Sequence, residues 1–180
     1  ASTTHLYVFV SYFFNLIFGK ENFIYPLLIF NSLLFTIGSY FLSKLILENP
    51  VHQAIFIFLF GILPPSIKIS ILGMEYGILF FLEMALLYFG FKQNKIWAQI
   101  LFPILILFTR IDTVIFLGIV FWVDIIWTKK VRWFYSLGGM LGVVVLMSFN
   151  WFYFGELVNN TIVAKSVTYA RNMSLALQWK

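Results

Sequence analysis

Long apolar segments with almost no charge are the feature that most limits the folds open to this chain. Residues 133–154 contain no charged side chain, and residues 23–47 contain only Lys44. As helices, segments of this length extend over about 30 Å or more, which is the thickness of the hydrocarbon core of a bilayer. Soluble domains carry roughly 25% charged residues, whereas this chain carries 11% and is 62% hydrophobic. The sequence therefore predicts an all-α polytopic transmembrane helix bundle and excludes a soluble globular domain.

Short polar connections divide the sequence into about six predicted membrane helices. Residues 6–18 form an earlier apolar segment that would be only about 20 Å long as a helix, so we expect it to lie at the membrane interface. Pro64-Pro65 interrupts the pattern because proline is poorly tolerated inside a helix, and residues 66–72 are expected to be a connector. The predicted membrane helices are 23–47, 51–63, 74–91, 96–108, 113–127 and 133–154.

Two short basic loops indicate how the helices are oriented. Residues 92–95 and 129–132 together carry five Lys or Arg residues and no acid. Such loops are enriched on the cytoplasmic side, so we expect these loops and the connection at 48–50 to lie in the cytoplasm and the alternate connections to face the outside of a bacterial inner membrane. The whole chain, 1–180, is then part of a single transmembrane domain, with an outer loop and interfacial helix at 1–22, membrane helices at 23–154 and an outer loop at 155–180.

Alternation of the helices places charged residues from three separate connections on the predicted outer side. They are Glu75, the pair Arg110 and Asp112, and the segment 156–165, which ends at Lys165. Charged groups at a membrane usually face a cavity or a partner, so their convergence predicts the rim of a site. Each also has a purely structural interpretation: a local Arg110–Asp112 ion pair, Glu75 as a helix-start acid, and Lys165 as a tail residue that reaches the interface.

Four segments of the sequence resemble motifs of one enzyme family. Residues 1–7 (ASTTHLY) are similar to a Thr-Ser-Pro-Leu-Trp stretch, and residues 73–76 (GMEY) to Gly-Met/Leu-Glu-Thr. Residues 109–112 (TRID) resemble Thr-Arg-Pro-Asp, and residues 154–165 resemble a Phe-Gly-x-x-x-Pro-Asn-Thr-x-x-Ala-Lys segment. The family is that of bacterial GT-C fold glycosyltransferases, which use polyprenyl-phosphate sugars, and the arabinofuranosyltransferase-like members are the most similar.

This resemblance implies a function for the charged residues. The chain would transfer a sugar from a polyprenyl-phosphate donor to a polysaccharide, lipid or protein acceptor of the cell envelope, on the outer face of the membrane. Arg110 and Lys165 would bind the donor phosphate. The residues implied as supporting or substrate-binding are Glu75, Asp112, Asn160 and Thr161.

The resemblance also implies that part of the enzyme is missing from this chain. In the family the general base is an Asp on the first outer loop, which would lie upstream of Ala1. We therefore expect a fragment that is inactive alone. Three positions depart from the family pattern, because His5, Ile111 and Asn159 stand where proline is usual. These changes affect the backbone and leave the polar residues in place.

The composition limits which cofactors and partners the chain can use. There is no Cys and there are only two His residues, so no metal site is predicted, and nothing in the sequence supports a divalent cation. Besides the donor and the acceptor, the expected partner is the lipid bilayer. No basic stripe with exposed aromatic residues is present, so nucleic acid is not expected. Two other functions remain open: a transporter or flippase for a lipid-linked sugar, and a non-catalytic membrane scaffold.

Two further patterns predict packing. Gly73 and Gly77, and likewise Gly138 and Gly142, have the small-xxx-small spacing that allows helices to approach closely. Asp124 lies close in sequence to a basic loop, and we expect it to form a structural ion pair with Lys129 or Lys130.

Overall fold

A computed structural model describes residues 5–71 and 75–155. Over these two ranges the chain is helical and contains no strand, which confirms the all-α prediction. A π-helix, η1 (Leu86–Lys92), continues α5, and a 3-10 turn, η2 (Ile111–Thr113), precedes α7. The α-helices are α1 (His5–Phe18), α2 (Ile24–Ile46), α3 (Pro50–Ile62), α4 (Pro64–Ile71), α5 (Tyr76–Ala85), α6 (Ile96–Thr109), α7 (Val114–Thr128) and α8 (Trp133–Phe154).

Three stretches of helix in the described ranges are long and apolar enough to cross a membrane. They are Ile24–Ile46, Ile111–Thr128 and Trp133–Tyr153. The apolar helices α1, α3 and α6 have between 10 and 17 residues and fall short of that length. The number of about six spans is therefore not confirmed, and the architecture is a helix bundle with three candidate membrane spans. The range predicted for the last helix, 133–154, matches α8.

The segment after the proline pair differs from its prediction. Residues 66–72 were expected to form a connector, yet most of them belong to helix α4. Pro64 and Pro65 occupy the first turn of α4, where the missing N–H groups are not needed for intrahelical hydrogen bonds. The proline pair therefore ends α3, as predicted, although the last helical residue is Ile62 and not the expected Leu63, and it also begins the next helix.

The centre of the bundle depends on close contact between helices that carry glycine. A Cβ atom added to Gly77 would lie 2.5 Å from the Asn31 carbonyl oxygen of α2, and one added to Gly138 would lie 2.6 Å from the Gln99 carbonyl oxygen of α6. At Gly142 it would lie 3.1 Å from a backbone carbon of α6. The predicted close packing is confirmed at these three glycines, and Gly73 lies outside the described residues.

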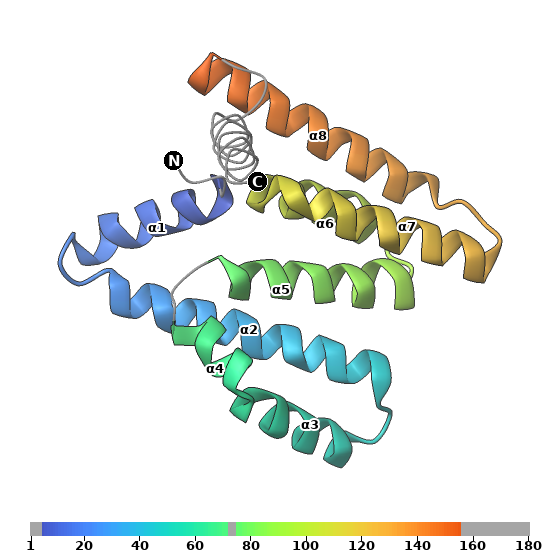
Figure 1. The fold of residues 1–180 in the computed structure, drawn as a ribbon, viewed down its shortest axis with the longest axis horizontal. Helices are drawn as coiled ribbons and strands as arrows, with labels where there is room; N and C mark the ends of the chain where they lie inside the picture. The colour runs from blue at the N-terminus through green and yellow to red at the C-terminus, as the bar shows by residue number, and fades with distance from the viewer. Residues whose placement is uncertain (1–4, 72–74, 156–180) are drawn as a thin grey trace, which may run out of the picture.

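The connections gather at two opposite ends of the bundle (Figure 1). At one end, which we call the basic end, lie the loops 47–49, 93–95 and 129–132. The Nζ of Lys92 donates to the Lys44 carbonyl oxygen there, and Nη1 of Arg132 donates to Oδ1 of Asn94 at 2.5 Å. The α1–α2 turn and the α6–α7 junction lie at the other end.

The ion pair predicted for Asp124 has a different partner. Nε of Arg132 lies 2.9 Å from Oδ2 of Asp124, so the pair forms with Arg132 and the prediction of Lys129 or Lys130 is wrong. Lys129 ends α7 in the left-handed conformation, with φ of 56°. This residue turns the chain back, and the turn brings Arg132 at the start of α8 over the last turns of α7.

Candidate substrate-binding site

Three charged residues from two connections meet at the end of the bundle opposite the basic end. Nε of Arg110 donates to Oδ1 of Asp112 at 2.9 Å, and Nη2 donates to Oδ2 of the same carboxylate at 2.5 Å. Nη1 of Arg110 donates to Oε1 of Glu75 at 3.2 Å. We call Glu75, Arg110 and Asp112 the Arg110 cluster. Two N–H bonds to one carboxylate fix the plane of the guanidinium group as well as its position.

Local backbone structure places these side chains. Arg110 lies between α6 and η2 in an extended conformation, with φ of −150° and ψ of 127°. Asp112 lies in the following 3-10 turn. Glu75 begins α5, where its carbonyl oxygen accepts the Leu79 N–H at 2.9 Å. The predicted local Arg110–Asp112 pair is therefore present, and it is extended by a residue 35 positions away.

Burial distinguishes the two carboxylates of the cluster. The Glu75 side chain is 14% exposed and the Arg110 side chain 22%, whereas the Asp112 side chain is 57% exposed. Glu75 begins a helix, as one structural interpretation expected, but its side chain is mostly buried and its carboxylate is paired. The Asp112 carboxylate is therefore accessible to a ligand from solvent, whereas the Glu75 carboxylate is mostly enclosed by the protein.

The cluster keeps Arg110 charged and carries an excess of negative charge. Hydrogen bonding to Asp112 raises the pKa of Arg110, burial opposes this, and Tyr76 adds a further hydrogen bond. The guanidinium carbon also lies 5.6 Å from the centre of the Tyr76 ring. Two carboxylates against one guanidinium suit a ligand that is rich in hydroxyl groups, because carboxylate oxygens accept hydrogen bonds. The carboxylates use three of the five N–H groups of Arg110, and the hydrogen bond with Tyr76 leaves one further N–H group.

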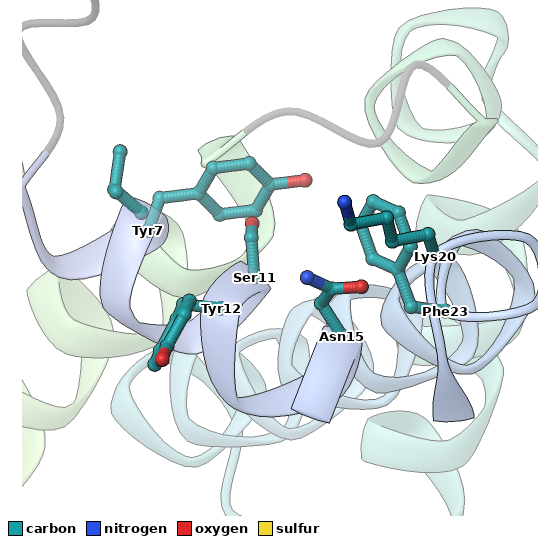
Figure 2. A pocket seen from close by; sticks show the side chains of 7 residues that line it. Tyr7, Ser11, Tyr12, Asn15, Lys20 and Phe23 are labelled. Carbon is teal, nitrogen blue, oxygen red and sulfur yellow. The ribbon is translucent and has the colours of Figure 1, made fainter. Parts of the chain in front are cut away.

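A cavity of about 670 Å³ lies along α1, and we call it the α1 cavity. Tyr7, Ser11 and Asn15 are spaced by four residues and so share one face of the helix. Figure 2 shows these three side chains and Lys20 directed into a common space, with Tyr12 turned away. The residues that line the cavity are Tyr7, Val8, Ser11, Tyr12, Asn15, Lys20 and Phe23.

Tyr7, which lines the α1 cavity, is also affected by the charge of Glu75 in the Arg110 cluster. Burial raises the pKa of the Tyr7 hydroxyl, a hydrogen bond with Ser11 lowers it, and the Glu75 carboxylate raises it further. The polar face of α1 was not among the predicted site residues. Its signal in the sequence is the four-residue spacing of Tyr7, Ser11 and Asn15 within an otherwise apolar segment.

Three of the six predicted site residues belong to the segment that follows α8 in the sequence. Lys165, Asn160 and Thr161 lie outside the described residues. Within ranges 5–71 and 75–155, no group of three or more His, Asp or Glu side chains could hold a metal ion. The structure therefore brings together Glu75, Arg110 and Asp112 out of the six predicted site residues.

Comparison with known proteins adds no information on function. No protein-family model, curated protein or solved structure matches this chain. The chemistry of the Arg110 cluster is therefore the basis for inferring function. It offers carboxylate acceptors on two sides of a fixed cation, beside a cavity that contains hydroxyl, amide and ammonium groups.

Proposed function

We propose that this chain is part of an integral membrane glycosyltransferase. It transfers a sugar from a polyprenyl-phosphate donor to a polysaccharide, lipid or protein acceptor of the cell envelope. The observation that carries the proposal is the Arg110 cluster, in which one guanidinium lies between two carboxylates from separate connections. The resemblance of residues 73–76 and 109–112 to GT-C glycosyltransferase motifs supports the same function, because these two segments supply all three members of the cluster.

The proposed roles follow from what each group can donate or accept. The N–H group of Arg110 that neither the carboxylates nor Tyr76 use would bind a phosphate oxygen of the donor. Asp112, the exposed carboxylate, would accept hydrogen bonds from sugar hydroxyls. Glu75 would hold the guanidinium in place through its ion pair with Arg110, and it is therefore a positioning residue. Lys165, Asn160 and Thr161 would complete the donor site from the segment after α8.

The reaction is a displacement at the anomeric carbon of the donor sugar. An acceptor hydroxyl attacks that carbon, the bond from carbon to the phosphate oxygen breaks, and the phosphate leaves with the electron pair. The hydroxyl proton passes to a general base, which the family resemblance assigns to an Asp upstream of Ala1. Negative charge grows on the leaving phosphate, so a fixed guanidinium beside it stabilises the transition state.

The proposed location is a bacterial inner membrane with the Arg110 cluster on the outer side. Two observations support this orientation. The loops 93–95 and 129–132 lie together at the basic end and carry four Lys or Arg residues. Basic loops of this kind are typical of the cytoplasmic side. The Arg110 cluster belongs to the start of α5 and the α6–α7 junction, which lie at the opposite end of the same bundle.

The test compares two arginine substitutions in the natural full-length protein. Arg110→Gln removes the proposed phosphate ligand, and Arg132→Gln is a matched control because Arg132 also pairs with a carboxylate and its side chain is also 22% exposed. In membrane vesicles supplied with a labelled polyprenyl-phosphate sugar, Arg110→Gln is expected to slow transfer about 100-fold or more. Arg132→Gln is expected to lower the yield of folded protein while leaving transfer per folded molecule unchanged.

Two results would refute the proposal in different ways. Equal transfer by Arg110→Gln and wild type would remove Arg110 from the donor site. Movement of the labelled donor across the vesicle membrane, without any new glycosidic product, would identify a flippase instead.

A further inference from the structure

We propose that the α1 cavity binds the headgroup of an anionic glycerol phospholipid, with its phosphate on Lys20 and a headgroup hydroxyl on Asn15. Phosphatidylglycerol has this chemistry. The inference uses the membrane location proposed above, but it concerns a lipid that is not consumed in the transfer reaction. Four observations carry it: the two faces of α1, the charge of the cavity, the Asn15 Oδ1 without a hydrogen-bond partner and the volume of the cavity.

Helix α1 has the two faces of a helix that lies in the plane of the membrane interface. Its apolar face is exposed, with Phe13 at 59%, Leu16 at 65% and Ile17 at 57%. Its polar face, with Tyr7, Ser11 and Asn15, lines the cavity. A helix of this kind buries its apolar face at the boundary between headgroups and acyl chains. The α1 cavity would then open at the depth where lipid phosphates lie.

The charge of the cavity favours an anion. Lys20 is the one charged residue among the described residues that line it, and the other polar groups are the uncharged side chains of Tyr7, Ser11 and Asn15. In the part of the chain that the structure describes, Lys20 forms no ion pair. No acidic residue is among the described residues that line the cavity, and the carboxylate that acts on Tyr7 is that of Glu75, which pairs with Arg110. An anionic group beside Lys20 therefore meets no carboxylate among the described residues of the cavity wall.

Asn15 distinguishes between lipid headgroups. Its Oδ1 is shielded from solvent and has no hydrogen-bond partner among the described residues. A buried acceptor without a donor is unfavourable, and rotation of the amide toward the cavity would let a ligand hydroxyl supply the missing hydrogen bond. The glycerol headgroup of phosphatidylglycerol offers such hydroxyls, whereas the headgroup of phosphatidylcholine has no donor.

The size and lining of the cavity suit this occupant. Its volume of about 670 Å³ lies within the usual range for small-ligand sites, about 300–1,000 Å³. Val8 and Tyr12 complete the wall next to the exposed face of α1, where the first carbons of an acyl chain would lie. A phospholipid is also the ligand present at high concentration wherever α1 lies in a membrane, so even modest selectivity keeps the site filled.

The test places a reporter at the cavity. The chain contains no Cys, so a single cysteine introduced by Tyr12→Cys can carry a fluorophore, and this side chain is 60% exposed and turned away from the cavity centre. The labelled chain is reconstituted in phosphatidylcholine bilayers that contain a minor fraction of brominated phosphatidylglycerol or, separately, brominated phosphatidylcholine. Quenching by each brominated lipid reports its occupancy beside α1.

We expect brominated phosphatidylglycerol to be preferred about fivefold over phosphatidylcholine, the selectivity typical of one basic residue near an anionic surface. Lys20→Gln should abolish the preference, and Asn15→Leu should reduce it. Lys95→Gln removes the same charge at the basic end, where Lys95 is exposed, and should leave the preference intact.

Three outcomes would overturn the proposal. The first is equal quenching by the two lipids in the wild-type chain, and the second is a preference that survives Lys20→Gln. The third is displacement of phosphatidylglycerol by a low concentration of polyprenyl phosphate, which would assign the cavity to the glycosyl donor. Glycosyl transfer is measured separately, so failure of the lipid site is distinguishable from failure of the proposed enzyme activity.

Discussion

At the scale of single residues, the two carboxylates of the Arg110 cluster should contribute unequally to stability. Glu75→Gln weakens a pair in which both side chains are mostly buried, and we expect it to lower the free energy of unfolding by about 1.5–3 kcal/mol. Asp112→Asn weakens a more exposed pair and should cost about 1 kcal/mol or less. Thermal unfolding of the purified chain in detergent micelles measures both values. A larger cost for Asp112→Asn would contradict the view that Glu75 is the anchor.

His5 provides a prediction for pH dependence. It is buried, and its ring lies 5.6 Å from the Phe108 ring and 5.0 Å from the Phe149 ring. Burial lowers its pKa from 6.5, although a hydrogen bond with Asn150 partly opposes the shift. The neutral form is thus favoured in the folded state, so its contribution to stability is complete above pH 6.5 and is lost as pH falls through the lowered pKa.

The corresponding experiment follows the melting temperature as the pH is lowered from 7 to about 5. The wild-type chain should lose stability over this range, and His5→Gln should lose less, because glutamine does not titrate. Identical pH profiles for the two proteins would show that the packing of α1 against α6 and α8 does not depend on a neutral His5.

At the scale of helices, adjacent glycines of α8 offer a matched comparison. A Cβ atom at Gly138 would lie 2.6 Å from the Gln99 carbonyl oxygen, whereas one at Gly139 would meet nothing within 4 Å. Gly138→Ala should therefore separate α6 from α8 and lower the free energy of unfolding by about 1–3 kcal/mol. Gly139→Ala should be neutral or should stabilise the protein by about 0.5–1 kcal/mol, since alanine favours helix. A guanidinium or heat denaturation series that ranks the two variants in the opposite order would contradict the described α6–α8 contact.

Helix ends could be predicted where a single physical cause determines them. The uncharged segment 133–154 coincides with α8, and Pro64-Pro65 ends α3, because charge in a membrane and proline inside a helix are both costly. The helical state of 66–71 could not be predicted in this way, since the same prolines are also favoured at a helix start. The Asp124–Arg132 pair was missed because it depends on the left-handed conformation of Lys129, which ordinary patterns do not indicate.

The candidate site, like the helix ends, could be predicted in part from the sequence. Alternation of helices placed Glu75 on the same side as Arg110, and the 3.2 Å contact agrees with that placement. The polar face of α1 was missed because the prediction rested on charged residues, and Tyr7, Ser11 and Asn15 are uncharged. Charge reveals where a membrane protein departs from apolar packing, whereas neutral polar side chains are common enough in helices that only their spacing is informative.

At the scale of the whole molecule, the bundle has a basic end and an end that carries the Arg110 cluster, and its orientation can be measured. Because the chain has no Cys, Lys130→Cys places a single thiol at the basic end, and Glu21→Cys places one in the exposed α1–α2 turn at the other end. In intact bacterial cells, we expect a membrane-impermeant maleimide to label the cysteine at position 21 and to label the one at position 130 only after the membrane is opened. Both positions are exposed, so unequal labelling reflects the side of the membrane and not burial. Labelling of position 130 alone in intact cells would invert the topology, and it would place the Arg110 cluster in the cytoplasm, where an outer-face transfer reaction could not use it.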